Sequence, residues 1–149
     1  MTLLGIHTPR FYQSICLGLL LATLSMGCEH AGLVEPEPSG ANGPTFTQLQ
    51  DNIFSKSCAL SGCHTGTFPP QGLNLTAGLA YNNLVGVQSQ EKQGVLRVAP
   101  GDPANSYIIM KITGAAGIAG GRMPLGRTPL SSEQIESIRL WIQSGALNN

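Results

Sequence analysis

Charge is scarce in this sequence, and the few charges that it has balance one another. Only 11% of the 149 residues are charged, and eight basic residues offset eight acidic ones, so the formal net charge is zero. A balanced chain offers no basic field for nucleic acid and no basic patch for a membrane. Overall charge therefore predicts no nucleic-acid partner and does not indicate any other kind of partner.

The sequence also lacks the residue combinations of common catalytic sites. No nucleophile–base pair, carboxylate pair or phosphate-binding loop stands out, and the serine and acidic residues fall at expected helix caps or on helix faces. We therefore expect a protein that is not itself an enzyme.

No apolar run near the N-terminus is long enough to span a bilayer comfortably. Residues 15–24 read I-C-L-G-L-L-L-A-T-L, whereas a spanning helix needs roughly 20 apolar residues. With Arg10 as their only charge, residues 1–27 are typical of an export signal.

The signal ends in L-S-M-G-C, where small residues before Cys28 resemble a bacterial lipobox. In that case Cys28 is lipidated, and its two acyl chains hold the protein on the periplasmic side of a membrane. The alternatives are an ordinary signal peptide or an uncleaved anchor, with Cys28 incidental.

Glycine and proline are abundant, at 19 and 10 residues, which predicts short elements and long connections. Residues 28–45 contain little apolar content and several of these breakers, so we expect a flexible tether. The folded domain is expected at residues 46–149.

Periodicity and capping signals predict a mostly α domain. Apolar residues recur at helical spacing over 47–57, and Thr76 is a candidate cap for a helix through Leu84. Asp102 and Pro103 predict the start of a helix that runs to Ile112. No pair of strands is expected, and Leu96 to Val98 form an isolated extended piece.

The C-terminal helix is the best specified of these elements. Ser131 and Gln134 form an S-x-x-Q capping box, and Gly145 ends the helix. Its apolar face is expected to comprise Ile135, Ile138, Trp141 and Ile142. Residues 114–129, rich in glycine, are expected to form a loop.

The sequence Cys58-Ala-Leu-Ser-Gly-Cys63-His64 is similar to the attachment sequence of c-type haem, C-x-x-C-H. Its two additional residues, Leu60 and Ser61 by length, can be looped out around Gly62 without separating Cys63 from His64. We expect thioether bonds from both cysteines and iron ligation by His64. The carbonyl of Pro69 or Pro70 is the expected partner of the His64 Nδ1 proton.

Three other interpretations of this motif remain open. Cys58 and Cys63 can form a disulfide in an oxidising compartment, although closing so short a loop stabilises little. They can bind zinc with His64, but no fourth Cys or His lies in the predicted folded domain. The three residues can also be unconnected.

Met123 is the expected second axial ligand. It lies in the glycine-rich sequence G-G-R-M-P, and Pro124 stiffens the backbone beside it. The alternative is an ordinary loop methionine. Met110, inside a predicted helix, is expected to fill the core. Arg97, Arg122 and Ser106 are candidates for bonds to haem propionates, or solvated surface residues.

Residues 53–146 resemble the mono-haem class I cytochrome c domain found in planctomycete-type and other bacterial exported proteins. The similar segments include I-F-S-K-S-C-A-L-S-G-C-H, R-V-A-P-G-D-P-A-N-S-Y, G-G-R-M-P-L-G and L-S-S-E-Q-I-E-S-I-R-L-W-I-Q-S-G-A. The resemblance implies a small fold of short helices and long loops around one haem. It implies His64 and Met123 as the axial ligands, and a first and last helix that cross near Trp141.

The function implied is electron transfer by a membrane-tethered, haem-carrying domain that contacts redox partner proteins transiently. Two alternatives stay open. One is a redox accessory subunit of a dedicated dehydrogenase or oxidase. The other is a non-redox binding or structural module with a Cys58–Cys63 disulfide.

Overall fold

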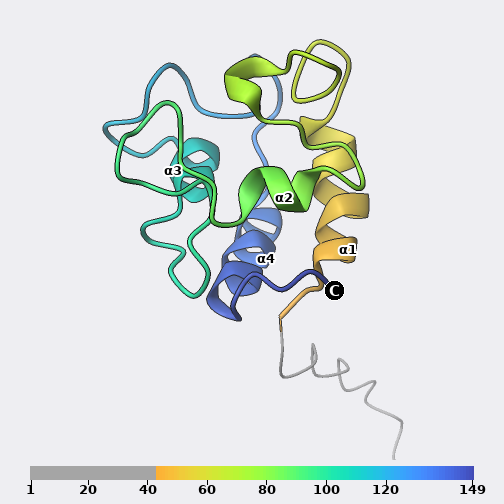
Figure 1. The fold of residues 1–149 in the computed structure, drawn as a ribbon, viewed down its shortest axis with the longest axis vertical. Coiled ribbons are helices and arrows are strands. Elements are labelled where there is room, and N and C mark those ends of the chain that lie inside the picture. The colour runs from red at the N-terminus through yellow and green to blue at the C-terminus, as the bar shows by residue number, and fades with distance from the viewer. Residues whose placement is uncertain (1–42) are drawn as a thin grey trace, which may run out of the picture. The chain divides into compact units, whose positions relative to one another are not determined.

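The computed structural model describes residues 43–149. The predicted export signal at 1–27, the candidate lipidation site Cys28 and the tether up to residue 42 lie outside the described residues. The described part consists of short helices joined by long loops, with isolated β-bridges in place of strands, which confirms the predicted mostly α class (Figure 1). None of the helices in this part is long and apolar enough to cross a membrane.

The first helical segment combines α1 (Phe46–Leu49) with η2 (Gln50–Cys58), which continues it with π-type hydrogen bonding. It begins at Thr45, whose hydroxyl accepts a hydrogen bond from the Gln48 amide at 3.1 Å while the Gln48 side chain accepts one from the Thr45 amide. The helix predicted at 47–57 is confirmed to within one residue at each end. It delivers the chain directly to Cys58.

Helix α4 (Ser132–Gln143) packs against the start of the first helix. The predicted capping box is present, because the Ser131 hydroxyl accepts from the Gln134 amide and the Gln134 side chain accepts from the Ser131 amide. The rings of Phe46 and Trp141 lie 5.3 Å apart between centroids. The first and last helices therefore meet at Trp141, as the resemblance implies.

Helix α2 (Ala80–Leu84) begins later than the sequence predicts, and Thr76 does not cap it. The Thr76 hydroxyl donates to the Asn74 side chain at 2.7 Å, and the helix has Leu79 at its N-cap position with no side-chain cap. The carbonyl of Thr76 accepts from the Leu79 and Ala80 amides and closes a turn before the helix.

Helix α3 (Tyr107–Thr113) also begins later than predicted, four residues after Pro103. The Asp102 carboxylate accepts bonds from the backbone and the side chain of Asn105 and closes a turn instead of starting the helix. The first two amides of α3 donate to the carbonyls of Leu96 and Arg97. The helix ends as predicted, with Gly114 in the left-handed conformation at φ 71°.

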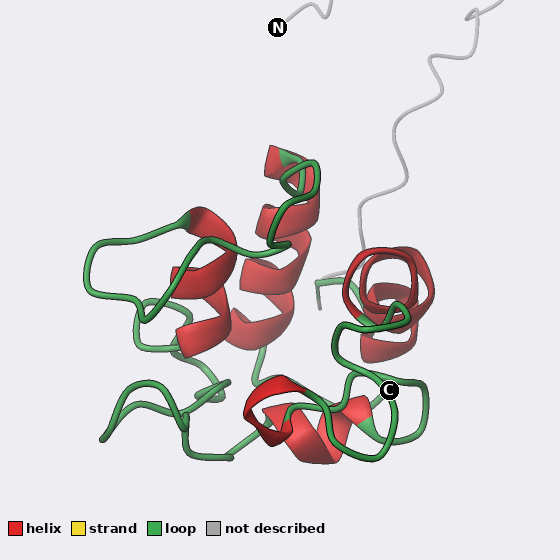
Figure 2. Ribbon diagram, turned by 90° about the horizontal axis from the view of Figure 1, so that it is seen from above, coloured by secondary structure: helices red, strands yellow, loops and turns green. Residues whose placement is uncertain are grey.

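The core lies where these helices converge (Figure 2). It contains residues from every α-helix and from the connecting segments: Phe46, Leu49, Ile53, Phe54, Leu75, Ala80, Leu84, Val98, Ile109, Ile112, Leu130, Ile138, Trp141, Ile142 and Ala146. A short 3₁₀ turn, η3 (Pro70–Gly72), lies in the loop after His64. The helices and this loop together leave a hollow beside the core.

Candidate functional site

A cavity of about 290 Å³ opens beside the core, and most of its wall is apolar. Its apolar residues come from η2, α2, α3 and α4 and from the loops after His64 and after α3. They are Phe54, Leu73, Leu75, Leu84, Tyr107, Ile108, Ile112, Met123, Leu125, Leu130 and Ile138. The polar groups in the wall are few, and they include Cys58, His64, Arg97, Lys111 and Glu91. An apolar cavity with a few convergent polar groups is the usual form of a ligand or cofactor site.

The segment between Cys58 and His64 folds back on itself as a tight turn. The Cys63 amide donates to the Leu60 carbonyl at 2.9 Å, and Gly62 takes a positive φ of 77° that this turn requires. The His64 amide then donates to the Cys58 carbonyl at 3.1 Å. The additional residues are thus extruded at the turn, and the end of η2 stays beside His64.

The orientation of the His64 ring is set by a backbone carbonyl. Its Nδ1 lies 3.1 Å from the Leu73 carbonyl oxygen, which can only accept, so Nδ1 carries the proton. The prediction that Pro69 or Pro70 supplies this carbonyl is wrong, because the loop returns to His64 three residues later. The Leu75 amide also donates to the His64 carbonyl at 2.8 Å, so a second hydrogen bond holds residues 73–75 beside His64.

Burial lowers the pKa of His64, although the bond to Leu73 opposes that effect and the nearby charges of Arg97, Glu91 and Lys111 act in both directions. The ring is therefore neutral near pH 7. With Nδ1 protonated, Nε2 keeps a free lone pair, which is the form of histidine that binds a metal.

Cys58 and Cys63 are separate, half-buried thiols in this structure, without the disulfide considered above. Cys58 lines the cavity, and burial together with the neighbouring Cys63 raises the pKa of its thiol to about 11. Cys58 is therefore a neutral thiol near pH 7.

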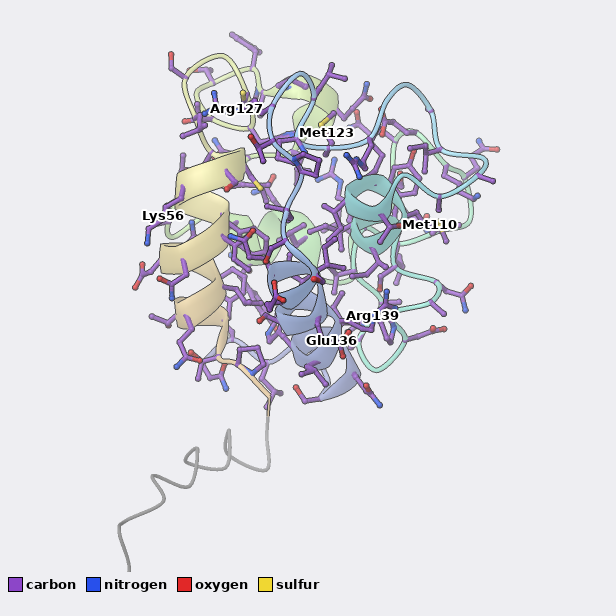
Figure 3. The ribbon with its side chains drawn as sticks, turned by 180° about the vertical axis from the view of Figure 1, so that it is seen from behind. Lys56, Met110, Met123, Arg127, Glu136 and Arg139 are labelled. Carbon is purple, nitrogen blue, oxygen red and sulfur yellow. The ribbon has the colours of Figure 1, made fainter. Side chains whose placement is uncertain are left out.

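Met123 reaches the cavity from the loop that follows α3. Its side chain lines the wall and packs against the core, and its amide donates to the Lys111 carbonyl at 2.9 Å. Met110, by contrast, lies on α3 outside the cavity wall and is half-exposed (Figure 3). The prediction that Met110 fills the core is wrong, because α3 turns Ile109 and Ile112 inward instead.

Arg97 is buried in the wall at 7% exposure. Its guanidinium donates to the carbonyls of Asn83 and Gln71. No carboxylate within residues 43–149 forms an ion pair with it. A buried cation that has only neutral acceptors favours an anionic group nearby.

The other two candidates for propionate contacts lie elsewhere. Ser106 is fully buried outside the cavity wall, and its hydroxyl donates to the Asp102 carbonyl and accepts from the Ala99 amide. Arg122 is exposed and lies over Gly114. Neither residue lines the cavity.

A second cation in the wall, Lys111, was not predicted from the sequence. Its Nζ forms an ion pair with Glu91 at 3.1 Å and donates to the Ala119 carbonyl at 2.7 Å. The sequence signal for its position is its spacing, since Ile108 lies three residues earlier on the same helix face. Nothing local to Glu91 indicates this pairing, because the ion pair joins two separate segments.

No group of three or more His, Cys, Asp or Glu side chains within residues 43–149 is arranged to hold a metal ion. Cys58, Cys63 and His64 thus do not form the zinc site considered above. No family model, curated protein or solved structure matches this chain.

Proposed function

We propose that this protein is an exported electron carrier with one covalently attached c-type haem. Cys58 and Cys63 would form the thioether bonds, and His64 and Met123 would be the proximal and distal ligands of the iron. The observation that carries the proposal is that Cys58, His64 and Met123, although Met123 lies far along the chain, all line one apolar cavity.

The potential ligands in the cavity suit a metal that is already coordinated by a cofactor. One imidazole and one thioether are too few to hold a bare ion in a closed site, but they match the two axial positions of a haem iron. His64 has its Nδ1 proton held by Leu73 and its Nε2 free. Cys58 lies in the same wall, and Cys63, across the turn from it, would supply the second thiol.

Arg97, another residue of the cavity wall, also favours haem as the bound group. Haem combines a large apolar ring with two carboxylates, and this mostly apolar wall contains one buried cation, Arg97, that no carboxylate within residues 43–149 pairs. A carboxylate beside Arg97 would compensate the cost of burying that charge.

The function follows from the ligands. His64 and Met123 would hold the iron from both sides and would leave no open position for oxygen chemistry, and methionine ligation would raise the reduction potential. Such a group supplies reversible one-electron transfer. The apolar side chains of the wall would exclude water from the bound ring.

We further propose that the carrier is anchored by a lipid at Cys28 on the periplasmic side of a bacterial membrane. This part rests on the export signal and lipobox-like sequence alone.

The test is expression of the full chain in a host with haem-attachment machinery, next to a known c-type cytochrome as a maturation control. We expect an intact mass one haem above that of the chain, with an added diacylglycerol and loss of residues 1–27. The alkaline pyridine spectrum should be that of haem bound through two thioethers. A colourless chain beside a normally matured control would refute the haem proposal.

Two variants test the assigned residues. Cys58→Ala should shift the pyridine spectrum to that of a single thioether, whereas His64→Ala should prevent accumulation of stable holoprotein. An unshifted spectrum in the first variant would show that Cys58 does not bind the haem.

A further inference from the structure

A second hollow, separate from the apolar cavity, lies between the end of η2 and the loop at residues 124–128. Its walls are Lys56, Ser57, Pro124, Gly126, Arg127 and Thr128. We name it the cationic groove. Lys56 and Arg127 come from these two different segments (Figure 3).

The groove offers donors without a matching acceptor. Within residues 43–149 the ion pairs are Lys111–Glu91 and Arg139–Glu136, so neither Lys56 nor Arg127 is paired with a carboxylate there. The Lys56 ammonium lies 3.4 Å from the neutral Asn52 side chain. Two cations beside the hydroxyls of Ser57 and Thr128 match the charge and hydrogen-bonding needs of an oxyanion.

The surroundings of the groove favour an oxyanion that belongs to a protein. Leu125, between the groove residues Pro124 and Gly126, is 67% exposed and also lines the apolar cavity. Arginine beside an exposed apolar side chain is typical of protein interfaces. A free phosphate would gain nothing from Leu125.

We propose that Lys56 and Arg127 form a carboxylate-binding groove through which an acidic partner protein docks beside Met123. The claim that the partner exchanges electrons at the groove rests on the proposed function. The groove adjoins the proposed haem-binding residues, because Met123 precedes Pro124 and Cys58 follows Ser57. The binding of carboxylates does not rest on it. Association would be transient and sensitive to salt, because the groove is open and exposed.

The first experiment measures binding without reference to redox chemistry. The ¹⁵N-labelled full chain is titrated at low ionic strength with a hexaglutamate peptide and, separately, with inorganic phosphate, and amide shifts are followed by NMR. We expect the peptide to give saturable shifts at Ser57, Gly126 and Thr128 and phosphate to give only weak, unsaturated ones.

The variant Lys56→Gln/Arg127→Gln should weaken peptide binding roughly five- to tenfold, as loss of two exposed charge contacts allows. The matched control is Lys92→Gln/Arg139→Gln, which removes the same charge outside the groove and should bind as the parent does. Saturation by phosphate alone, equal weakening in both variants, or no shifts at the groove would each overturn the proposal.

The second experiment measures electron exchange at this surface. Reduced holoprotein is oxidised by hexacyanoferrate(III), an anion, and by tris(phenanthroline)cobalt(III), a cation, in a stopped-flow instrument. The groove variant should lower the first rate at least about threefold and raise the second at low ionic strength, and both differences should vanish in high salt.

The two experiments separate the two proposals. Groove-specific peptide binding with no reaction toward either oxidant would keep the groove as a carboxylate site and refute the haem. Normal oxidation of the holoprotein with identical rates in the groove and control variants would keep the haem and refute docking at the groove.

Discussion

Met123 and Met110 differ in what surrounds their thioethers. Met123 lines the cavity that also holds His64, whereas Met110 lies on α3 outside the cavity wall. If Met123 is the distal ligand, Met123→Ala should retain haem, lower the midpoint potential and abolish the sulfur-to-iron charge-transfer band, since methionine ligation raises the potential. Redox titration and absorption spectroscopy of the ferric protein measure both effects.

Met110→Ala is the matched control, because it removes a thioether of the same size from a half-exposed position. Its potential and band should equal those of the parent. A retained band in Met123→Ala together with a lost band in Met110→Ala would assign the ligand to Met110.

Residues of the site could be predicted where a side chain itself carries the signal. Cys58, His64 and Met123 were identified from their type and spacing, and they line one cavity. The role of the Leu73 carbonyl could not be predicted, because every residue has a carbonyl and only the path of the loop brings this one to His64. The Lys111–Glu91 pair likewise depends on how two segments approach.

The turn at residues 102–105 shows how an element signal can serve another structure. Asp102 accepts bonds from both the side chain and the amide of Asn105, and these bonds lower the pKa of its carboxyl. A lowered folded-state pKa stabilises the fold above the unfolded-state pKa, and this contribution is lost as the pH falls through the folded-state value.

Asn105→Ala should therefore raise the pKa of Asp102 toward its ordinary value, because it removes the side-chain bond and leaves only the backbone bonds from residues 104 and 105. The variant should have less acid-dependent stability to lose than the parent. An NMR titration of the Asp102 carboxyl measures the shift, and Glu133, whose lowered pKa arises from its own helix start, is the internal control. An unchanged Asp102 pKa would contradict this role of Asn105.

The same turn explains which elements could be predicted. Helix α4 matches its prediction because its N-terminal cap is local: the side chains of Ser131 and Gln134 each accept a hydrogen bond from the other residue's amide. Helix α3 begins four residues late because Asp102 bonds within the turn, and the amides of α3 find carbonyls at residues 96–97. That choice of partner depends on chain packing and cannot be seen in a local window.

At the scale of the described residues, the start of the first helix lies against the C-terminus and the last helix. Phe46 packs against Trp141, Tyr81 and Phe54. The Thr47 amide and hydroxyl both donate to the Asn149 carbonyl, at 3.0 and 2.8 Å. The aromatic cluster thus joins the first and last helices, and the two Thr47 bonds hold the C-terminal residue against the first helix.

Trp141 is the largest member of this contact and is 1% exposed. Trp141→Ala should lower the free energy of unfolding by about 3–5 kcal/mol, the usual cost of removing a buried tryptophan. Leu140→Ala, at a 42% exposed neighbour, should cost much less. Chemical denaturation followed by circular dichroism measures both, and similar losses in the two variants would mean that the cluster does not hold the helices together.

The hydrogen bond that orients His64 ends on a main-chain atom, the Leu73 carbonyl. Substitution of Leu73 can change its apolar contact with the cavity but cannot delete that acceptor. The tautomer of His64 is therefore determined by the path of the loop and not by the identity of a neighbouring side chain. Sequences can drift at position 73 while the imidazole keeps its orientation, and an alanine scan would not reveal the atom responsible.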